Sequence, residues 1–198
     1  MQRNPDGGNG DQDRASVYHR AGTQADVPAV LDLIDGAVRW LAERGRTGQW
    51  GTERQSTNPR RIAMVTGWAR ESGLVLACVP AVAAAGGGPS SGEQVVGALA
   101  VGTARSYAPP VNEPELYVNL LVTDRRWAGR GIGGALLDEA RRIAVERGAT
   151  LLRVDCYAGG DRALVRYYER AGFTAAEPFT IDQPGGRWPG QILSQRIR

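Results

Sequence analysis

The sequence predicts an α/β protein built on a mixed sheet, and two observations carry this prediction. Apolar, β-branched runs alternate along the chain with segments whose apolar residues recur at helical spacing. The stretch from Leu116 to Arg147 contains one complete example, in which a strand leads through a glycine- and arginine-rich loop into a helix. Residues 1–15 are polar and cannot bury much surface, so we expect a flexible tail there. Because no repeat or second domain is visible, we expect one domain at residues 16–198.

Each expected element has a local signal. Thr23 and Asp26 have the spacing of a capping box for the first helix, and Asn58 followed by Pro59 is a good start for the second. Asp161 is expected to cap the last helix. Strands are expected at residues 16–21, 74–79, 95–103, 116–122, 150–156, 173–181 and 191–197, and helices at residues 23–45, 58–72, 132–147 and 161–170. Loops rich in glycine and proline are expected at residues 80–93 and 185–190.

Composition argues against several classes of function. The net charge is +3 and acidic residues accompany the arginines along the expected helices, so we predict no nucleic-acid binding. No apolar run is long enough to span a bilayer and no secretory leader is visible, which predicts a cytoplasmic protein without a membrane partner. Cys78 and Cys156 lie in or beside expected strands and are predicted to be buried free thiols. No metal site is expected.

The loop that follows the central strand has the features of an anion-binding site. First-turn N–H groups of a helix lack internal partners, the helix dipole is positive there, and glycine lets a ligand approach the backbone. The spacing of Gly129, Gly131 and Gly134 matches a dinucleotide fingerprint, and Asp155 lies near the distance of a ribose-binding acid. Residues 123–128 separate that fingerprint from its strand, however, which disfavours a Rossmann fold and a nucleotide-dependent oxidoreductase.

Two motifs favour another interpretation of the same loop. Residues 126–131, Arg-Trp-Ala-Gly-Arg-Gly, resemble the R/Q-x-x-G-x-G/A signature of the GNAT N-acetyltransferases, which bind the pyrophosphate of acetyl-CoA. Residues 168–173, Tyr-Glu-Arg-Ala-Gly-Phe, resemble that family's Tyr-x-x-x-Gly-Phe ending. The resemblance covers about residues 116–173 and implies the GNAT acyl-CoA N-acyltransferase fold. In that fold a central, mostly antiparallel sheet is flanked by helices, and its fourth and fifth strands run parallel and splay apart.

The resemblance also implies the donor and its contacts. Acetyl-CoA would be the acetyl donor, with no metal, and its pantetheine would pair with the backbone of Leu120, Leu121 and Val122. The pyrophosphate would be cradled by Arg126, Gly129, Arg130, Gly131, Ile132, Gly133 and Gly134. Asp161 stands where the family frequently has a cofactor-contacting asparagine. A carboxylate cannot donate a hydrogen bond and repels phosphate, which puts this single contact in doubt.

Two residues are candidates for the catalytic proton transfers. Tyr168 matches the position of the family's general-acid tyrosine, which returns a proton to the leaving thiolate. Glu115 precedes Arg126 by the interval at which some GNAT enzymes carry a strand glutamate as general base. The alternatives are that Glu115 is a solvated charge at the strand entry, or that the base is a water held by Tyr117 or Asn119. Strand alternation places on one side Glu115, Tyr117, Asn119 and Leu121, and among these Tyr117 and Asn119 are also candidate contacts of the acceptor.

Trp40 and Trp50 lie around the connection between the first two helices, which commonly lines the acceptor pocket in this family. The alternative is that both tryptophans close the core. The sequence therefore predicts an N-acetyltransferase that transfers the acetyl group directly to a primary amine of a small molecule or peptide. By family analogy a homodimer is one expected assembly. A non-catalytic acyl-CoA sensor is the alternative from another class, and retention of Tyr168 and Glu115 favours the enzyme.

Overall fold

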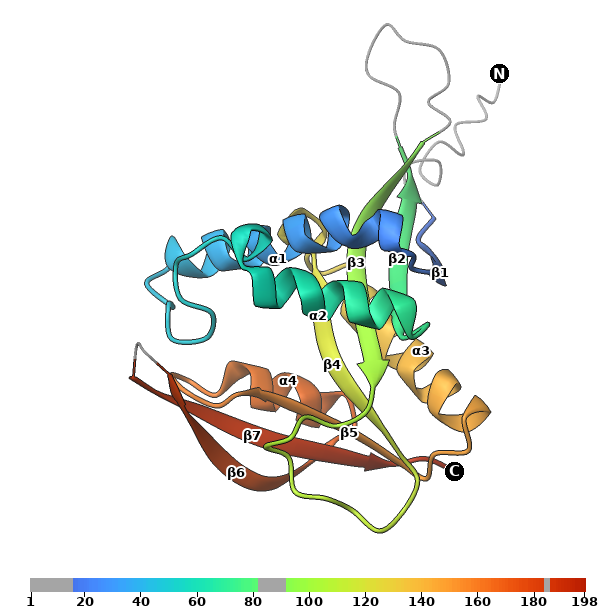
Figure 1. Ribbon diagram of the computed structural model, residues 1–198, viewed down its shortest axis with the longest axis vertical. Helices are drawn as coiled ribbons and strands as arrows, with labels where there is room; N and C mark the ends of the chain where they lie inside the picture. Colours follow the sequence, from blue (N-terminus) through green and yellow to red (C-terminus); the bar gives the residue numbers. More distant parts are fainter. Residues whose placement is uncertain (1–15, 82–91, 184–185) are drawn as a thin grey trace, which may run out of the picture.

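The computed structural model describes residues 16–81, 92–183 and 186–198. The tail predicted at residues 1–15 and most of the loop predicted at residues 80–93 lie outside this part of the chain. Seven strands form one sheet in the order β1-β2-β3-β4-β5-β7-β6 (Figure 1). The β4–β5 pair is parallel and the other neighbouring pairs are antiparallel. The predicted mixed α/β fold class is confirmed.

The elements agree with the sequence signals over most of their length. The strands are β1 (Tyr18–Ala21), β2 (Leu74–Pro80), β3 (Glu93–Gly102), β4 (Glu115–Thr123), β5 (Leu151–Tyr157), β6 (Thr174–Gln183) and β7 (Gly186–Arg196). The helices are α1 (Val27–Ala42), α2 (Pro59–Arg70), α3 (Ile132–Glu146) and α4 (Ala163–Arg170), with 3-10 turns at Gln24–Asp26, Gln55–Thr57 and Arg125–Trp127. No helix among the described residues is long and apolar enough to cross a membrane.

The helices cover the two faces of the sheet. α1 and α2 lie next to each other on one face of β2–β4, and α3 lies on the opposite face (Figure 1). The apolar stripe predicted on α3 is buried, since Leu136 and Ala140 are fully excluded from solvent. α4 shares the core on the α3 side through Val165 and Tyr168. Both cysteines are free and buried, as predicted.

The predicted helix caps are present with small differences. The backbone N–H of Thr23 donates to the Asp26 carboxylate at 2.7 Å, and a 3-10 turn then leads into α1. The Asn58 side chain accepts the N–H groups of the first turn of α2 at 3.0 and 3.3 Å. Asp161 accepts the Ala163 N–H at 3.1 Å, although Arg162 occupies the cap position itself. These signals are readable from the sequence because each acts within one turn.

The prediction of a loop at residues 185–190 is wrong, because residues 186–190 belong to β7. The β6 and β7 strands pair as a long hairpin in which Ile181 faces Trp188 and Phe179 faces Gly190. Glycine and proline are poor strand formers on average, but cross-strand pairing overrides that preference. The hairpin places the Trp188 side chain of β7 against the loop that follows α1.

A β-bulge at Asn119 redirects the side chains of the central strand. The β3–β4 register slips by one residue there, and Asn119 has no partner on β3. Val118 before the bulge packs into the core on the α3 side, whereas Leu120 after it packs beneath α1 and α2. The prediction that Tyr117 and Leu121 share one side is therefore wrong, because the extra residue inverts the alternation beyond it.

The parallel strands β4 and β5 separate beside this bulge. Their pairing extends from Glu115 opposite Leu151 to Val118 opposite Val154. Beyond that point β4 continues along β3 and β5 continues along β7. The predicted splay is confirmed, and it leaves a gap in the sheet where one edge of β4 has no neighbouring strand.

Candidate active site

Two adjoining cavities open at the gap between β4 and β5. The first, called here the glycine-turn cavity, has a volume of about 370 Å³ and is lined by residues 121–123, the turn at residues 127–129 and 131–134, and the side of α4. The second, called here the strand-gap cavity, has a volume of about 320 Å³ and lies between residues 118–121 of β4 and residues 154–157 of β5. The cavities share Gln49, Trp50, Leu121, Leu164 and Tyr168. A ligand lying in the first cavity therefore ends beside a ligand in the second.

The glycine turn presents backbone N–H groups to the first cavity. Gly129 and Gly131 have φ of 79° and 75°, the left-handed region that favours glycine. The first helical hydrogen bond of α3 joins the Ala135 N–H to the Gly131 carbonyl at 3.0 Å. Within the described chain, the N–H groups of residues 132–134 therefore have no hydrogen-bond partner. Free first-turn N–H groups at the positive end of a helix dipole are suited to bind an anion.

The arginines around this turn are placed differently from the prediction. Arg126 forms an ion pair with Asp124 at 2.6 Å and its side chain is 78% exposed. Arg130 stacks on Trp127, with 4.5 Å between the guanidinium carbon and the ring centroid. Neither arginine lines the glycine-turn cavity, whereas Arg125 does. The sequence signature identified the position of the turn but gave no signal for Arg125, whose guanidinium lies over the Trp40 ring of α1 at 4.3 Å from its centroid.

The backbone predicted to carry the pantetheine lines the cavities. Leu121 lines both cavities, Leu120 lines the strand-gap cavity and Val122 lines the glycine-turn cavity. Asp161 lies outside both, and its carboxylate faces Arg46 on the surface at 3.4 Å. The doubtful cofactor contact of Asp161 therefore has no support in this arrangement.

Tyr168 lies where the cavities meet. Tyr168 is 6% exposed, and its ring packs edge-on against Tyr167 and Phe173 at centroid distances of 5.3 and 5.7 Å. Burial raises the pKa of the hydroxyl, which forms no hydrogen bond with any other described residue. A neutral O–H with free donor capacity is thus directed into a cavity.

Tyr167 also reaches the glycine turn. It lines the glycine-turn cavity, and a Cβ added to Gly133 would collide with its hydroxyl. Glycine at position 133 thus permits the close approach of α4 to the first turn of α3.

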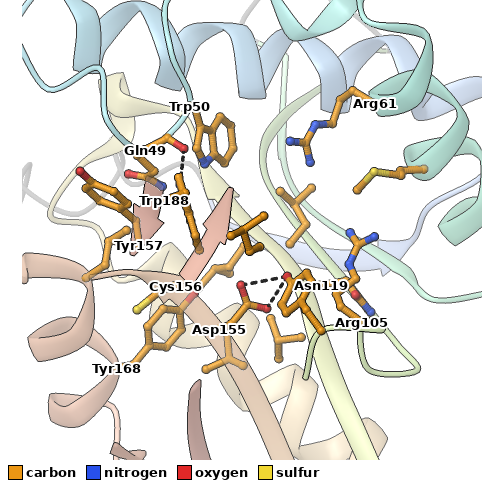
Figure 2. A pocket seen from close by; sticks show the side chains of 18 residues that line it. Gln49, Trp50, Arg61, Arg105, Asn119, Asp155, Cys156, Tyr157, Tyr168 and Trp188 are labelled. Carbon is orange, nitrogen blue, oxygen red and sulfur yellow. Dashed lines mark hydrogen bonds between the residues drawn. The ribbon is translucent and has the colours of Figure 1, made fainter. Parts of the chain in front are cut away.

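Asp155 is the acid that lines the strand-gap cavity (Figure 2). The Tyr117 hydroxyl donates to its Oδ1 at 2.8 Å, and the Tyr107 hydroxyl lies 3.2 Å from both oxygens. Burial raises the pKa of Asp155 despite these hydrogen bonds, which favour the charged form. The sequence offered one signal that we did not use for this site, an acid within an otherwise buried strand.

Glu115, the predicted base, lies elsewhere. Its carboxylate forms a bidentate ion pair with Arg153 at 2.6 and 3.1 Å, and the two side chains are 19% and 6% exposed. Glu115 lines neither cavity of the site. The structure thus does not bring Glu115 and Tyr168 together, and it also removes the alternative of a solvated strand-entry charge.

The four predicted acceptor contacts divide into two pairs. Trp50 lines both cavities and Asn119 lines the strand-gap cavity, where its amide donates to the Thr103 carbonyl at 3.1 Å. Tyr117 is fully buried and reaches the site only through its hydrogen bond to Asp155. Trp40 lies outside both cavities, and the guanidinium groups of two arginines approach its ring at 4.2 and 4.3 Å.

Aromatic side chains from β5 and β7 form one wall of the strand-gap cavity. Trp188 on β7 donates its indole N–H to the Gln49 carbonyl at 2.9 Å, which joins β7 to the loop after α1 (Figure 2). Tyr157 packs against Trp188 at a centroid distance of 5.6 Å. The sequence could not show this wall, because its two sides are 139 residues apart.

Comparison with known proteins gives a consistent result. The model of the acetyltransferase (GNAT) family matches residues 90–173. A search of curated proteins finds no match to this sequence. Among solved structures, an N-acetyltransferase from Staphylococcus aureus Mu50 superposes with a TM-score of 0.65 at 17% identity, covering 92% of this chain and 99% of that chain.

Two further structures have the same fold. The yncA protein of Salmonella typhimurium, whose structure contains its cofactor acetyl-CoA, has a TM-score of 0.63 at 17% identity and covers 92% of this chain and 95% of that chain. A ribosomal-protein-alanine N-acetyltransferase from Brucella melitensis has a TM-score of 0.60 at 22% identity, with coverages of 91% and 99%. At these identities the likeness shows a shared fold, while residue roles rest on the geometry of the site.

Proposed function

We propose that this chain is an acyltransferase of the GNAT family, whose model matches residues 90–173, and that it transfers the acetyl group of acetyl-CoA directly to a primary amine of a small molecule. The observation that carries the proposal is the meeting of the two cavities at Tyr168. One cavity presents anion-binding N–H groups, and the other contains a carboxylate. Direct transfer requires that donor and acceptor be held side by side in this way.

The glycine turn fits the pyrophosphate of acetyl-CoA. A Cβ placed on Gly129, Gly131 or Gly134 would meet no other atom within 4 Å, so the approach to the backbone is open. The free N–H groups of residues 132–134 would bind the pyrophosphate oxygens, and the unpaired edge of β4 would align the rest of the molecule. When bound, acetyl-CoA supplies an acetyl thioester whose sulfur is a good leaving group.

Asp155 is the base in this proposal, in place of Glu115. An amine with a pKa of about 10.4 is protonated at pH 7, and its neutral form costs about 4.6 kcal/mol to reach. Asp155 lines the acceptor cavity, and its raised pKa makes it a stronger proton acceptor than an ordinary aspartate. A backbone N–H near Leu121 would stabilise the negative charge that develops on the carbonyl oxygen.

Tyr168 is the proton donor to the leaving sulfur. Its raised pKa keeps the hydroxyl protonated at neutral pH, and the hydroxyl has no competing acceptor among the described residues. A positioned hydrogen bond to the departing thiolate therefore stabilises the transition state without first breaking a bond within the protein.

Cys156 supports direct transfer over an acyl-enzyme route. This thiol lines the strand-gap cavity, but burial raises its pKa to about 12. A thiol with that pKa is almost entirely neutral at pH 7, and the neutral thiol is a poor nucleophile. We therefore expect both substrates to bind before either product leaves.

The test combines binding with turnover. Acetyl-CoA should raise the melting temperature where NAD does not, and a panel of small primary amines should contain acceptors that release free CoA. Initial rates with both substrates varied should give intersecting lines, and the Cys156→Ala variant should give the same pattern. Parallel lines would contradict direct transfer. An absence of CoA release from the whole panel would contradict the acetyltransferase proposal.

A further inference from the structure

Two arginines lie on one side of the strand-gap cavity. Arg61 comes from α2 and Arg105 from the segment that follows β3, and both line the cavity. Figure 2 shows them on the side opposite Tyr157 and Trp188, with Asp155 between the two sides. The cavity thus has a cationic side, an aromatic side and a carboxylate between them.

These arginines have no carboxylate partner among the described residues. Arg61 donates to the neutral side-chain oxygen of Gln55 at 3.3 Å, and its guanidinium carbon lies 5.7 Å from the centroid of the Trp50 ring. Arg105 lies 5.4 Å from the ring of Trp68. Burial and the nearby charge of Arg105 lower the pKa of Arg61, so the two cations repel each other. Two like charges in a partly buried site favour the binding of an anion.

Arg153 provides a comparison within the same chain. Its side chain is 6% exposed and forms a bidentate ion pair with Glu115. A buried arginine in this fold is therefore neutralised when the protein itself supplies an acid. Arg61 and Arg105 form no ion pair with a described carboxylate, although the charge of Arg105 attracts that of Asp155, and both side chains face the cavity.

Resting on the proposed function, we infer that the acceptor is a small primary amine that also carries an anionic group, of the free amino acid type. Its anion lies between Arg61 and Arg105, and its amine lies at Asp155. Guanidinium groups bind carboxylates and related oxyanions through paired, charge-assisted hydrogen bonds. Trp188 on the aromatic side of the cavity, together with Trp50 beside Arg61, contacts the apolar part of the acceptor.

The same geometry distinguishes this acceptor from a protein N-terminus. The carboxyl carbon of an N-terminal residue is part of an amide and carries no charge, so it leaves both arginines unpaired. The cavity volume of about 320 Å³ is also at the lower end of the range for small-ligand sites. Both points favour a free small molecule.

The experiment compares matched acceptors that differ in one charge. Free amino acids, their carboxamides and the corresponding amines without a carboxyl group are each assayed for CoA release at saturating acetyl-CoA. For the best acceptor, kcat/KM should exceed that of its carboxamide by about 10- to 100-fold, the contribution of a hydrogen-bonded charge. Arg61→Gln and Arg105→Gln should each raise KM for the amino acid by a similar factor and reduce the preference for the amino acid over its carboxamide.

Two controls separate charge recognition from folding. Arg60 is an exposed neighbour that does not line the cavity, so Arg60→Gln should leave kcat/KM unchanged for both the amino acid and its carboxamide. All three variants should keep the wild-type thermal shift with acetyl-CoA, which would show an intact fold. Turnover that is equal for the amino acid and its carboxamide, or equal in the wild type and both cavity variants, would overturn this inference and leave the acetyltransferase proposal intact. Failure of every amine to release CoA would overturn the proposed function and this inference together.

Discussion

Replacement of Tyr168 by phenylalanine removes one oxygen atom from the point where the cavities meet. The ring contacts with Tyr167 and Phe173 are kept, and the hydroxyl has no hydrogen-bond partner within the described chain. We therefore expect a change in unfolding free energy of no more than about 0.5 kcal/mol. That corresponds to a shift of about 1–2 °C in melting temperature for a chain of this length.

The effect on catalysis should be much larger. A positioned proton donor contributes about 10²- to 10⁴-fold to rate, which is about 3–5 kcal/mol of activation free energy. The kcat measured by CoA release should fall by this factor, while the dissociation constant of acetyl-CoA, measured by calorimetry, stays the same. Tyr18→Phe is a matched control, since Tyr18 lies on the edge strand β1 and hydrogen-bonds to Glu93. An unchanged kcat would refute the donor role, and lost acetyl-CoA binding with a large fall in melting temperature would show that Tyr168 acts by packing.

Three further predictions, on Asp155, Gly131 and Glu115, test the remaining parts of the site. Because the pKa of Asp155 is raised and the carboxylate is the active form, kcat/KM should fall as the pH drops through that raised pKa, which gives an acidic limb in the pH profile. Asp155→Asn should abolish this acidic limb and most of the activity. Tyr107→Phe removes a hydrogen bond that favours the carboxylate, so it should move the acidic limb to higher pH. A limb that persists in Asp155→Asn would assign the base to another group. Gly131→Ala forces a side chain into a φ of 75° at a cost of about 1–2 kcal/mol and should raise the dissociation constant of acetyl-CoA by calorimetry, whereas Gly36→Ala inside α1 should leave it unchanged. Equal affinity in both glycine variants would show that the turn does not bind the donor. Glu115→Gln weakens a mostly buried ion pair, so it should lower the unfolding free energy by about 1–3 kcal/mol in denaturant titrations and spare kcat; a loss of kcat at full stability would restore Glu115 as the base.

Local signals in the sequence were sufficient for the frame of the molecule. The turn at Gly129 and Gly131 follows from the backbone geometry that glycine permits, and the start of α2 follows from a cap followed by proline. The glycine-turn cavity was predictable for the same reason. Its N–H groups belong to one helix terminus, so a single short stretch of chain contains the whole feature.

The strand-gap cavity depends on contacts between distant parts of the chain. The bulge at Asn119 is a property of pairing with β3, and the separation of β4 from β5 follows from how far their ladder extends. Glu115 was a reasonable base from its spacing alone, but the parallel register with β5 brings it to Arg153.

The sequence by itself thus determined the order of the elements, the glycine turn and the identity of Tyr168 as the residue at the site. Only the tertiary structure decided which acid accompanies it, because Asp155 acquires its surroundings from Tyr107 and Tyr117, which lie 48 and 38 residues away. Local backbone preferences are encoded within a few residues, whereas the burial and pairing of a charge depend on which strands become neighbours.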